Sequence, residues 1–385
     1  MKTTFLNHLY NKLFVLSRIA ILCFLPLFFS MSASASILLQ VSGGGFHSLV
    51  LKPDGTVLAW GQNMHGQVGD GTNTNRNTPV QVKGLSSVIA ISGGAWHSVT
   101  LKSDGTVWAW GSNWTGQLGD STTISRNKPV QVNNLGDIVA ISAKGLHSLA
   151  LKSDGTVWSW GRNVHGQLGD GTNTDKNTPV QVRRLSDVIA ISAGGYHNLA
   201  QKADGTIWAW GLNQNGQLGD GSVTNRNIPV QVSGLKDISS IHCGGDHSIV
   251  LKNDGTVWVW GFNQFGQLGD KSVDNRSTPS SVNNLKDVIA VDGGGDHSIV
   301  LTSDGKVLTW GNNENGQLGD GTTISKAFPV QVSAIDDITA IASGGQHNIA
   351  IRSNGTVWTW GLNRTGQLGD GSTVSKKTPV PAETN

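Results

Sequence analysis

Charged side chains are scarce in this sequence, and neither sign is in excess. Asp, Glu, Lys and Arg make up 14% of the 385 residues, with 28 basic against 26 acidic side chains. Residues 1–35 carry Lys2, Lys12 and Arg18 and no acidic residue, which leaves 25 basic and 26 acidic residues, a formal charge of −1, in the rest. A chain without a basic excess lacks the electrostatic footprint of nucleic-acid binding. We therefore expect no nucleic-acid partner.

Cysteine and methionine are also rare. There are 2 Cys and 3 Met beside 51 Gly and 14 Trp, a composition that argues against a helical protein. Cys23 lies within the first 35 residues, so only Cys243 remains after them. We expect Cys243 to be a small buried side chain without a disulfide partner.

Sequence motifs of common catalytic sites are missing. The chain has no Gly-x-Ser-x-Gly elbow, no phosphate-binding loop and no characteristic pair of carboxylates. These absences predict a protein that is not an enzyme and that uses no cofactor.

The first 35 residues have the features of a secretory signal peptide. Basic residues flank an apolar core from Ile19 to Phe29, and Ala33-Ser34-Ala35 supplies small residues for cleavage after Ala35. The core contains Pro26 and is short beside the roughly 20 residues that span a membrane. We expect a secreted or periplasmic protein without stable membrane insertion after cleavage. An uncleaved anchor is the alternative.

Residues 36–385 are seven copies of a 50-residue unit. A Trp-Gly pair, a histidine, an aspartate and a proline each recur at this spacing, without insertion or deletion. In the fourth copy they are Trp210, His197, Asp220 and Pro229. Such strict periodicity indicates a repeat architecture in which every copy is the same structural unit.

Each copy contains four short runs with β character. In the fourth copy these are residues 188–192, 198–202, 206–211 and 229–232, and Asp204-Gly205 predicts a tight hairpin of type I′ between the second and third. Both faces of these strands are apolar, which requires a sheet buried on both sides. The pattern predicts an all-β, seven-bladed propeller of four-stranded antiparallel blades. We expect the N-terminal strand at residues 38–41 to complete the last sheet and close the ring.

The repeat, with Gly-Gly-x-His-Ser, then Asp-Gly-Thr-Val-Trp-x-Trp-Gly-x-Asn-x-x-Gly-Gln-Leu-Gly-Asp-Gly and Pro-Val-Gln-Val, resembles that of the regulator of chromosome condensation family. The resemblance covers residues 36–385 and implies that family's seven-bladed propeller. Members include a nuclear nucleotide-exchange factor, a plant ultraviolet-B photoreceptor, secreted bacterial propellers that inhibit β-lactamases, and bacterial effectors. The fold alone does not choose among these functions.

Departures from the family pattern narrow the choice. The photoreceptor resemblance requires tryptophan two residues before certain repeat histidines, where this sequence has only glycine or alanine, as at Gly45 and Ala95. The basic tail of the nuclear factor is missing, and no copy has the extra length of its inserted wedge. Similarity to the secreted β-lactamase-inhibiting propellers agrees best with a signal peptide.

The residues that recur in every copy are expected to be structural. Seven equivalent histidines, such as His197, should satisfy buried backbone groups at the start of a strand. The Gly-Asp-Gly-Thr loops carry oxygen donors but lack a complete calcium ligand set, so Asp170 and its equivalents should cap turns. No metal site is predicted.

Two sets of positions vary while the scaffold repeats, and such positions supply binding residues. One set precedes the repeat histidines, and the other lies inside Asn-x-x-Gly. Aromatic residues in exposed loops are typical of binding hot spots, and acidic residues beside them would attract basic groups. The predicted partner-binding residues are Phe46, Met64, Trp96, Trp114, Tyr196, Asp246, Phe265 and Asp296.

Together these features predict an exported, monomeric, non-catalytic propeller that binds a protein partner and inhibits or regulates it. Nucleotide exchange on a small GTPase is the alternative. A glycan-binding propeller is a third hypothesis, but it requires several equivalent sites, and the variable positions differ between copies.

Overall fold

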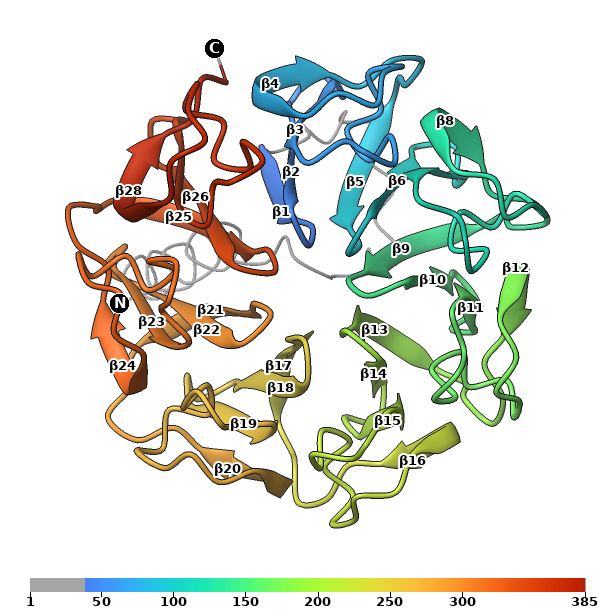
Figure 1. Cartoon of the computed structure of the whole chain (residues 1–385). Coiled ribbons are helices and arrows are strands. Elements are labelled where there is room, and N and C mark those ends of the chain that lie inside the picture. Colours follow the sequence, from blue (N-terminus) through green and yellow to red (C-terminus); the bar gives the residue numbers. More distant parts are fainter. Residues whose placement is uncertain (1–38, 385) are drawn as a thin grey trace, which may run out of the picture. The chain divides into compact units, whose positions relative to one another are not determined.

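The computed structural model describes residues 39–384, which form seven four-stranded antiparallel sheets arranged as blades around a common centre (Figure 1). This confirms the predicted all-β, seven-bladed propeller. The predicted signal peptide, residues 1–35, lies outside the described residues. Within residues 39–384 no helix could span a membrane.

Every blade uses four consecutive strands, with the first nearest the centre and the fourth at the periphery (Figure 1). The strands are, blade by blade, β1 (Gln40–Gly43), β2 (His47–Leu51), β3 (Val57–Gly61) and β4 (Arg76–Gln81); β5 (Val88–Gly93), β6 (His97–Lys102), β7 (Val107–Gly111) and β8 (Arg126–Gln131); β9 (Ile138–Ala143), β10 (His147–Lys152), β11 (Val157–Gly161) and β12 (Lys176–Gln181); β13 (Val188–Ala193), β14 (His197–Lys202), β15 (Ile207–Gly211) and β16 (Arg226–Gln231); β17 (Ile238–Cys243), β18 (His247–Lys252), β19 (Val257–Gly261) and β20 (Arg276–Ser281); β21 (Val288–Gly293), β22 (His297–Thr302), β23 (Val307–Gly311) and β24 (Lys326–Gln331); and β25 (Ile338–Ser343), β26 (His347–Arg352), β27 (Val357–Gly361) and β28 (Lys376–Pro381).

The predicted hairpin between β14 and β15 is present, but its turn type differs from the prediction. The amide of Gly205 donates to the carbonyl of Lys202 at 2.9 Å, and the amide of Lys202 donates to the carbonyl of Thr206 at 2.9 Å. Only Gly205 has a positive φ, 83°, whereas type I′ needs positive φ at both central residues. The loop therefore has three residues, with glycine in the left-handed position.

The fourth strand of each blade begins earlier than predicted. In the fourth blade it starts at Arg226, which pairs with Gly211 across a bulge. Arg226 is held there by Asp220, whose Oδ2 accepts from Nε at 3.1 Å and from Nη2 at 2.9 Å. Pro229 is tolerated inside the strand because β16 is the outer edge of its sheet.

The ring does not close by strand exchange, and the prediction that the N-terminal strand completes the last sheet is wrong. β1 pairs with β2, because only three residues separate them, and the last blade has its own inner strand, β25. The junction of the last and first blades uses the contacts of every other junction. Trp60 Nε1 donates to the carbonyl of Gln367 at 2.9 Å, as Trp110 Nε1 does to that of Gln67 at 2.8 Å.

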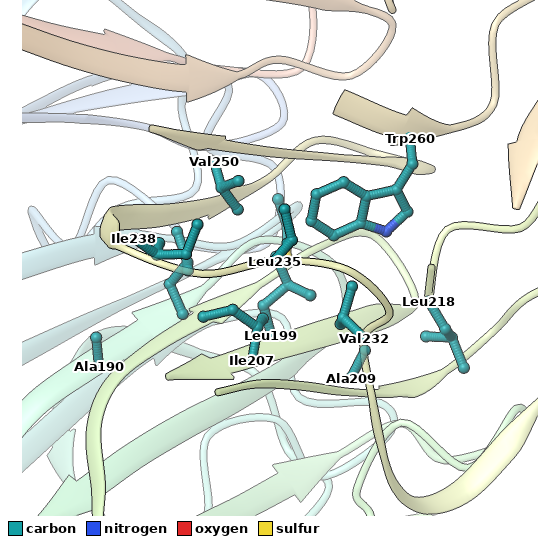
Figure 2. Close-up of a cluster of buried hydrophobic side chains, with 12 residues drawn as sticks. Ala190, Leu199, Ile207, Ala209, Leu218, Val232, Leu235, Ile238, Val250 and Trp260 are labelled. Carbon is teal, nitrogen blue, oxygen red and sulfur yellow. The ribbon is translucent and has the colours of Figure 1, made fainter. Parts of the chain in front are cut away.

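The core lies between neighbouring blades. Trp260 of the fifth blade is fully buried against the fourth, among Leu199, Ile207 and Val232 (Figure 2). Burying both faces of each sheet in this way agrees with the apolar pattern of the strands. Cys243 is 2% exposed in the same cluster and unpaired, and burial raises the pKa of its thiol to about 12. It is an inert core residue, as predicted.

The seven repeat histidines form a buried belt between the blades. His47 Nε2 lies 2.9 Å from Ser98 Oγ of the next blade, and His347 Nε2 lies 2.9 Å from Ser48 Oγ across the ring junction. In the third and sixth blades the partner is an asparagine, such as Asn198. The belt is structural, as predicted, but each imidazole pairs with a side chain of the next blade instead of a backbone group.

Candidate functional site

The two sets of variable positions lie on the same face of the propeller. The residue before the Gly of Asn-x-x-Gly reaches the residue before the histidine of the next blade. Thr115 Oγ1 donates to the carbonyl of Leu146 at 3.4 Å, and Asn315 Nδ2 donates to Gln346 Oε1 at 3.0 Å. We call the surface formed by these turns and the adjoining loops at residues 71–75, and their equivalents, the variable face.

A scaffold of residues repeated in each blade holds the loops of this face. In the third blade Asn163 is fully buried, its Oδ1 accepts from the amide of Leu168 at 2.9 Å, and its Nδ2 donates to the carbonyl of Thr174 at 3.1 Å. The Asn-x-x-Gly turn, which carries one set of variable positions, is thereby tied to the loop at residues 171–175. Because the scaffold uses only repeated residues, the side chains at the two variable positions are free to differ.

The Gly-Asp-Gly-Thr loops use their carboxylates within this scaffold. Asp70 Oδ1 accepts from the amide and the hydroxyl of Thr72 at 2.9 and 2.7 Å, and Asp70 Oδ2 accepts from Arg76 Nε at 2.7 Å. Burial acts to raise the pKa of Asp70, but these donors outweigh it and hold the pKa below its usual value. The turn-capping role predicted for these aspartates is the observed one. Residues 39–384 contain no cluster of three metal-ligating side chains.

Three aromatic side chains gather at the junction of the first two blades. The ring centroid of His65 lies 4.5 Å from that of Trp114 and 5.8 Å from that of Trp96, and the two indoles are 6.0 Å apart. Trp114 is 59% exposed, while Trp96 is half-buried. The structure thus brings together two of the predicted aromatic anchors and adds His65, which was not predicted.

The remaining predicted aromatic residues do not join this cluster. The ring centroids of Tyr196 and His165 are 5.5 Å apart, and the Arg162 guanidinium lies 5.7 Å from the centroid of the Tyr196 ring. Phe265 packs on Phe262, with ring centroids 6.1 Å apart. Both residues are half-buried, as is Phe46, whereas Met64 is 63% exposed. The predicted patch is therefore several separate groups on one face.

The predicted acidic residues lie close enough to influence each other. Burial, together with the neighbouring Asp246 and Glu314 carboxylates, raises the pKa of Asp296 to about 6. Burial also raises the pKa of Asp246, although Gln217 Nε2 donates to its Oδ1 at 3.3 Å. No ion pair within residues 39–384 involves these three carboxylates. Neighbouring carboxylates without an ion-pair partner favour a cationic group as ligand.

Sequence reasoning missed a row of aliphatic side chains on the variable face. Five blades present one from the loop at residues 71–75 or its equivalent, and each is 58–64% exposed: Ile124, Val223, Val273, Ile324 and Val374. The signal was available, because an aliphatic residue in a polar Ser/Thr/Asn loop has no core to enter.

Sequence reasoning also missed Lys144, which replaces a glycine present in the other six copies. Its Nζ donates to the carbonyl of Gly293, so the side chain of a third-blade residue reaches the sixth blade. Nearby, His242 Nδ1 lies 3.5 Å from Asp292 Oδ1. Burial acts to raise the pKa of Asp292, but Lys144 and His242 outweigh it and lower that pKa.

Known proteins share this repeat and this ring. The Ultraviolet-B receptor UVR8 of Arabidopsis thaliana is 46% identical over 50 residues, which are 13% of this chain and 11% of that receptor. Human WBSCR16 superposes with a TM-score of 0.78 at 20% identity, covering 86% of this chain and 94% of that one. Prp20p of Saccharomyces cerevisiae, described with its binding to Gsp1p and histones, gives 0.77 at 23% identity, with 91% and 87% covered. These two likenesses show the fold alone.

A family model decides the assignment. The model of the RCC1-like domain matches residues 26–200 and 136–385, which together include every blade. The chain belongs to the RCC1-like domain family.

Proposed function

We propose that this protein is an exported, non-catalytic propeller that binds a protein partner through the variable face. One observation carries the proposal. Eleven large apolar side chains are exposed in the described chain, and eight of them lie on this face, as Met64, Trp114, Ile124, Val164, Val223, Val273, Ile324 and Val374. Each of the seven blades contributes at least one. Exposed apolar surface gathered on one face is typical of a protein interface.

Charge on the face adds a preference for the partner. Asp246, Asp296 and Glu314 lie on one side, in the fifth and sixth blades, while the Trp96 and Trp114 cluster lies in the second. A partner segment that carries a basic side chain near apolar ones would match both sectors. The family likeness supports protein binding as well, since Prp20p is described as binding Gsp1p and histones.

Affinity capture with matched variants tests the proposal. The purified protein is compared with a Met64→Ser/Trp114→Ser variant, which alters two exposed side chains of the face, and with Val139→Ser/Phe328→Ser, which alters two exposed side chains elsewhere. Secreted, envelope and host-cell proteins serve as the source. We expect one partner that the wild type and the second variant retain and the first variant loses by at least about tenfold in affinity. Equal capture by all three forms would contradict the proposal.

The identity of the captured protein separates the two regulatory roles. A secreted or envelope enzyme whose turnover falls on binding makes the propeller an inhibitor. A small GTPase whose GDP release accelerates makes it an exchange factor, the alternative function. Export is tested separately, by sequencing the N-terminus of the protein recovered outside the cytoplasm. Cleavage after Ala35 is expected from the Ala-Ser-Ala motif.

A further inference from the structure

Two hollows occupy equivalent places at the rim of the variable face. The first, of about 290 Å³, lies between the first and second blades and is lined by His65, Asn73, Arg126, Asn127 and Lys128, among others. The second, of about 390 Å³, lies between the third and fourth blades and is lined by residues including His165, Asn173, Arg184, Arg226 and Asn227. In Figure 1 these junctions are separated by the second and third blades. Both volumes suit a small ligand or one unit of a larger one.

Four polar residues are shared by the two hollows, a histidine and an asparagine from one blade and an arginine and an asparagine from the next, and they occur together at only two of the seven junctions. The histidine is replaced at the other five by Thr115, Asn215, Phe265, Asn315 and Thr365. The first asparagine is replaced there by Thr123, Val223, Val273, Thr323 and Thr373. The set is therefore not part of the repeated scaffold. These two similar junctions provide the equivalent sites that a glycan-binding propeller requires.

The same hydrogen bonds arrange the amides in both hollows. Asn127 Nδ2 donates to Asn73 Oδ1 at 3.0 Å and to the carbonyl of Gly71 at 3.1 Å, and Asn227 repeats this with Asn173 and Gly171 at 3.0 and 3.2 Å. Both hydrogens of Nδ2 are thereby used in Asn127 and in Asn227. The Oδ1 atom of each of these two residues accepts no hydrogen bond from residues 39–384 and can accept one from a ligand.

The two imidazoles face the hollows without a hydrogen bond to their ring nitrogens from residues 39–384. Burial lowers the pKa of His65, and burial together with Arg162 lowers that of His165 although Asp246 acts to raise it, so the neutral form of both rings is favoured. A neutral imidazole offers one donor and one acceptor. Each ring also packs on an aromatic side chain of the next blade, Trp96 or Tyr196, which gives the hollow a rigid wall.

The charge of the hollows favours an anion of low charge. No carboxylate lines either one. Arg126 and Arg226 are each paired with an aspartate of their own blade, Asp120 or Asp220, at 3.0 and 2.9 Å. One cation outside any ion pair of the described chain remains in each hollow, Lys128 in the first and Arg184 in the second.

We propose that each hollow binds an acidic sugar unit, a pyranose ring that bears a carboxylate. The single unpaired cation matches one carboxylate, where a phosphate dianion would call for several. The free amide oxygen and the neutral imidazole match hydroxyl groups, which donate and accept. Two such hollows on one face allow an acidic polysaccharide to engage both, which raises its apparent affinity over that of a single unit. The polar residues of the hollows are not among the exposed apolar side chains of the proposed protein interface, although His65 packs on Trp114 at the first hollow.

Titration calorimetry with defined sugars tests the proposal on the purified protein. The probes are galacturonate, hexagalacturonate and the neutral maltohexaose. The variant His65→Ala/His165→Ala removes both imidazoles, and Thr115→Ala/Asn215→Ala alters the same position in the two alternate blades as the matched control. We expect two galacturonate sites per chain in the wild type, and one site in each of the single variants His65→Ala and His165→Ala. Hexagalacturonate binding should weaken about tenfold in the double histidine variant and stay unchanged in the control.

A second variant keeps the test decisive if the histidine variants fold poorly. Lys128→Met/Arg184→Met removes the unpaired cations from exposed positions. It is expected to reduce the preference for hexagalacturonate over maltohexaose at least tenfold. Stronger binding of hexagalacturonate than of galacturonate identifies a polymer as the ligand, and equal binding identifies a free acidic sugar. Absence of hexagalacturonate binding, or binding that neither variant changes, would overturn the proposal. A Met64→Ser variant should retain sugar binding even if it loses the protein partner.

Discussion

At the scale of single residues, Lys144 is the clearest departure from the repeat. It places an ammonium beside the Gly293 carbonyl and within electrostatic reach of Asp292, whose carboxylate is 19% exposed. Without that ammonium, only His242 and the backbone amides that donate to Asp292 would oppose the effect of burial on its pKa, so its charged form would be less favoured. Lys144 therefore links two blades that do not neighbour each other.

Substituting this lysine should destabilise the propeller. We expect Lys144→Met to lower the free energy of unfolding at pH 7 by about 1–3 kcal/mol, since the Asp292 carboxylate would lose the ammonium that stabilises its charged form. In an Asp292→Asn background the same substitution should cost less, because the neutral amide needs no cation. Urea denaturation of the four proteins measures the difference. An equal loss in both backgrounds would show that Lys144 and Asp292 do not interact.

At the scale of the element, the loops of the variable face depend on one buried asparagine per blade. Asn163→Ala would leave the amide of Leu168 and the carbonyl of Thr174 without their partner. We expect a loss of about 2–4 kcal/mol in the free energy of unfolding, because each buried unsatisfied group costs about 1–3 kcal/mol. Val164→Ala, at the next and exposed position, should change it little. If thermal unfolding showed the two variants to be equally stable, the asparagine would not be holding the loop.

The strands were predictable because each copy carries its own local signals. Asp-Gly marks a hairpin and the Trp-Gly pair marks a buried strand, so the sheet order followed from one copy. The position of the inner strand within the repeat was predicted wrongly for the last blade, since the seventh copy already contains its own inner strand, β25, at residues 338–343. Proximity between blades has no signal in a single copy. The contact of His65 with Trp96, and that of Lys144 with Gly293, depend on how neighbouring and opposite blades meet.

At the scale of the whole molecule, ring closure makes the seven junctions equivalent. The histidine belt passes through every one of them, including that between the last and first blades. Burial lowers the pKa of each belt histidine to about 3 or about 4, as for His97 and His47. The Nδ1 atoms have no partner within the described residues, so protonation would add a buried charge at each junction.

The ring should therefore lose stability steeply in mild acid. In the unfolded chain these histidines titrate near pH 6.5, so between that pH and about 4 the unfolded state binds more protons than the folded state. The stabilisation is complete above pH 6.5 and is lost as the pH falls through this window, at up to about 1.4 kcal/mol per pH unit for each histidine. Carboxylates with lowered pKa, such as Asp70, act only below about pH 4. Urea unfolding followed by tryptophan fluorescence at successive pH values gives the free energy of unfolding at each pH. Its slope against pH in this window should correspond to the uptake of several protons on unfolding. The His65→Ala/His165→Ala variant, which keeps all seven belt histidines, should retain most of that slope. A wild-type slope of one proton or fewer would mean that the folded ring accepts charged imidazoles at its junctions.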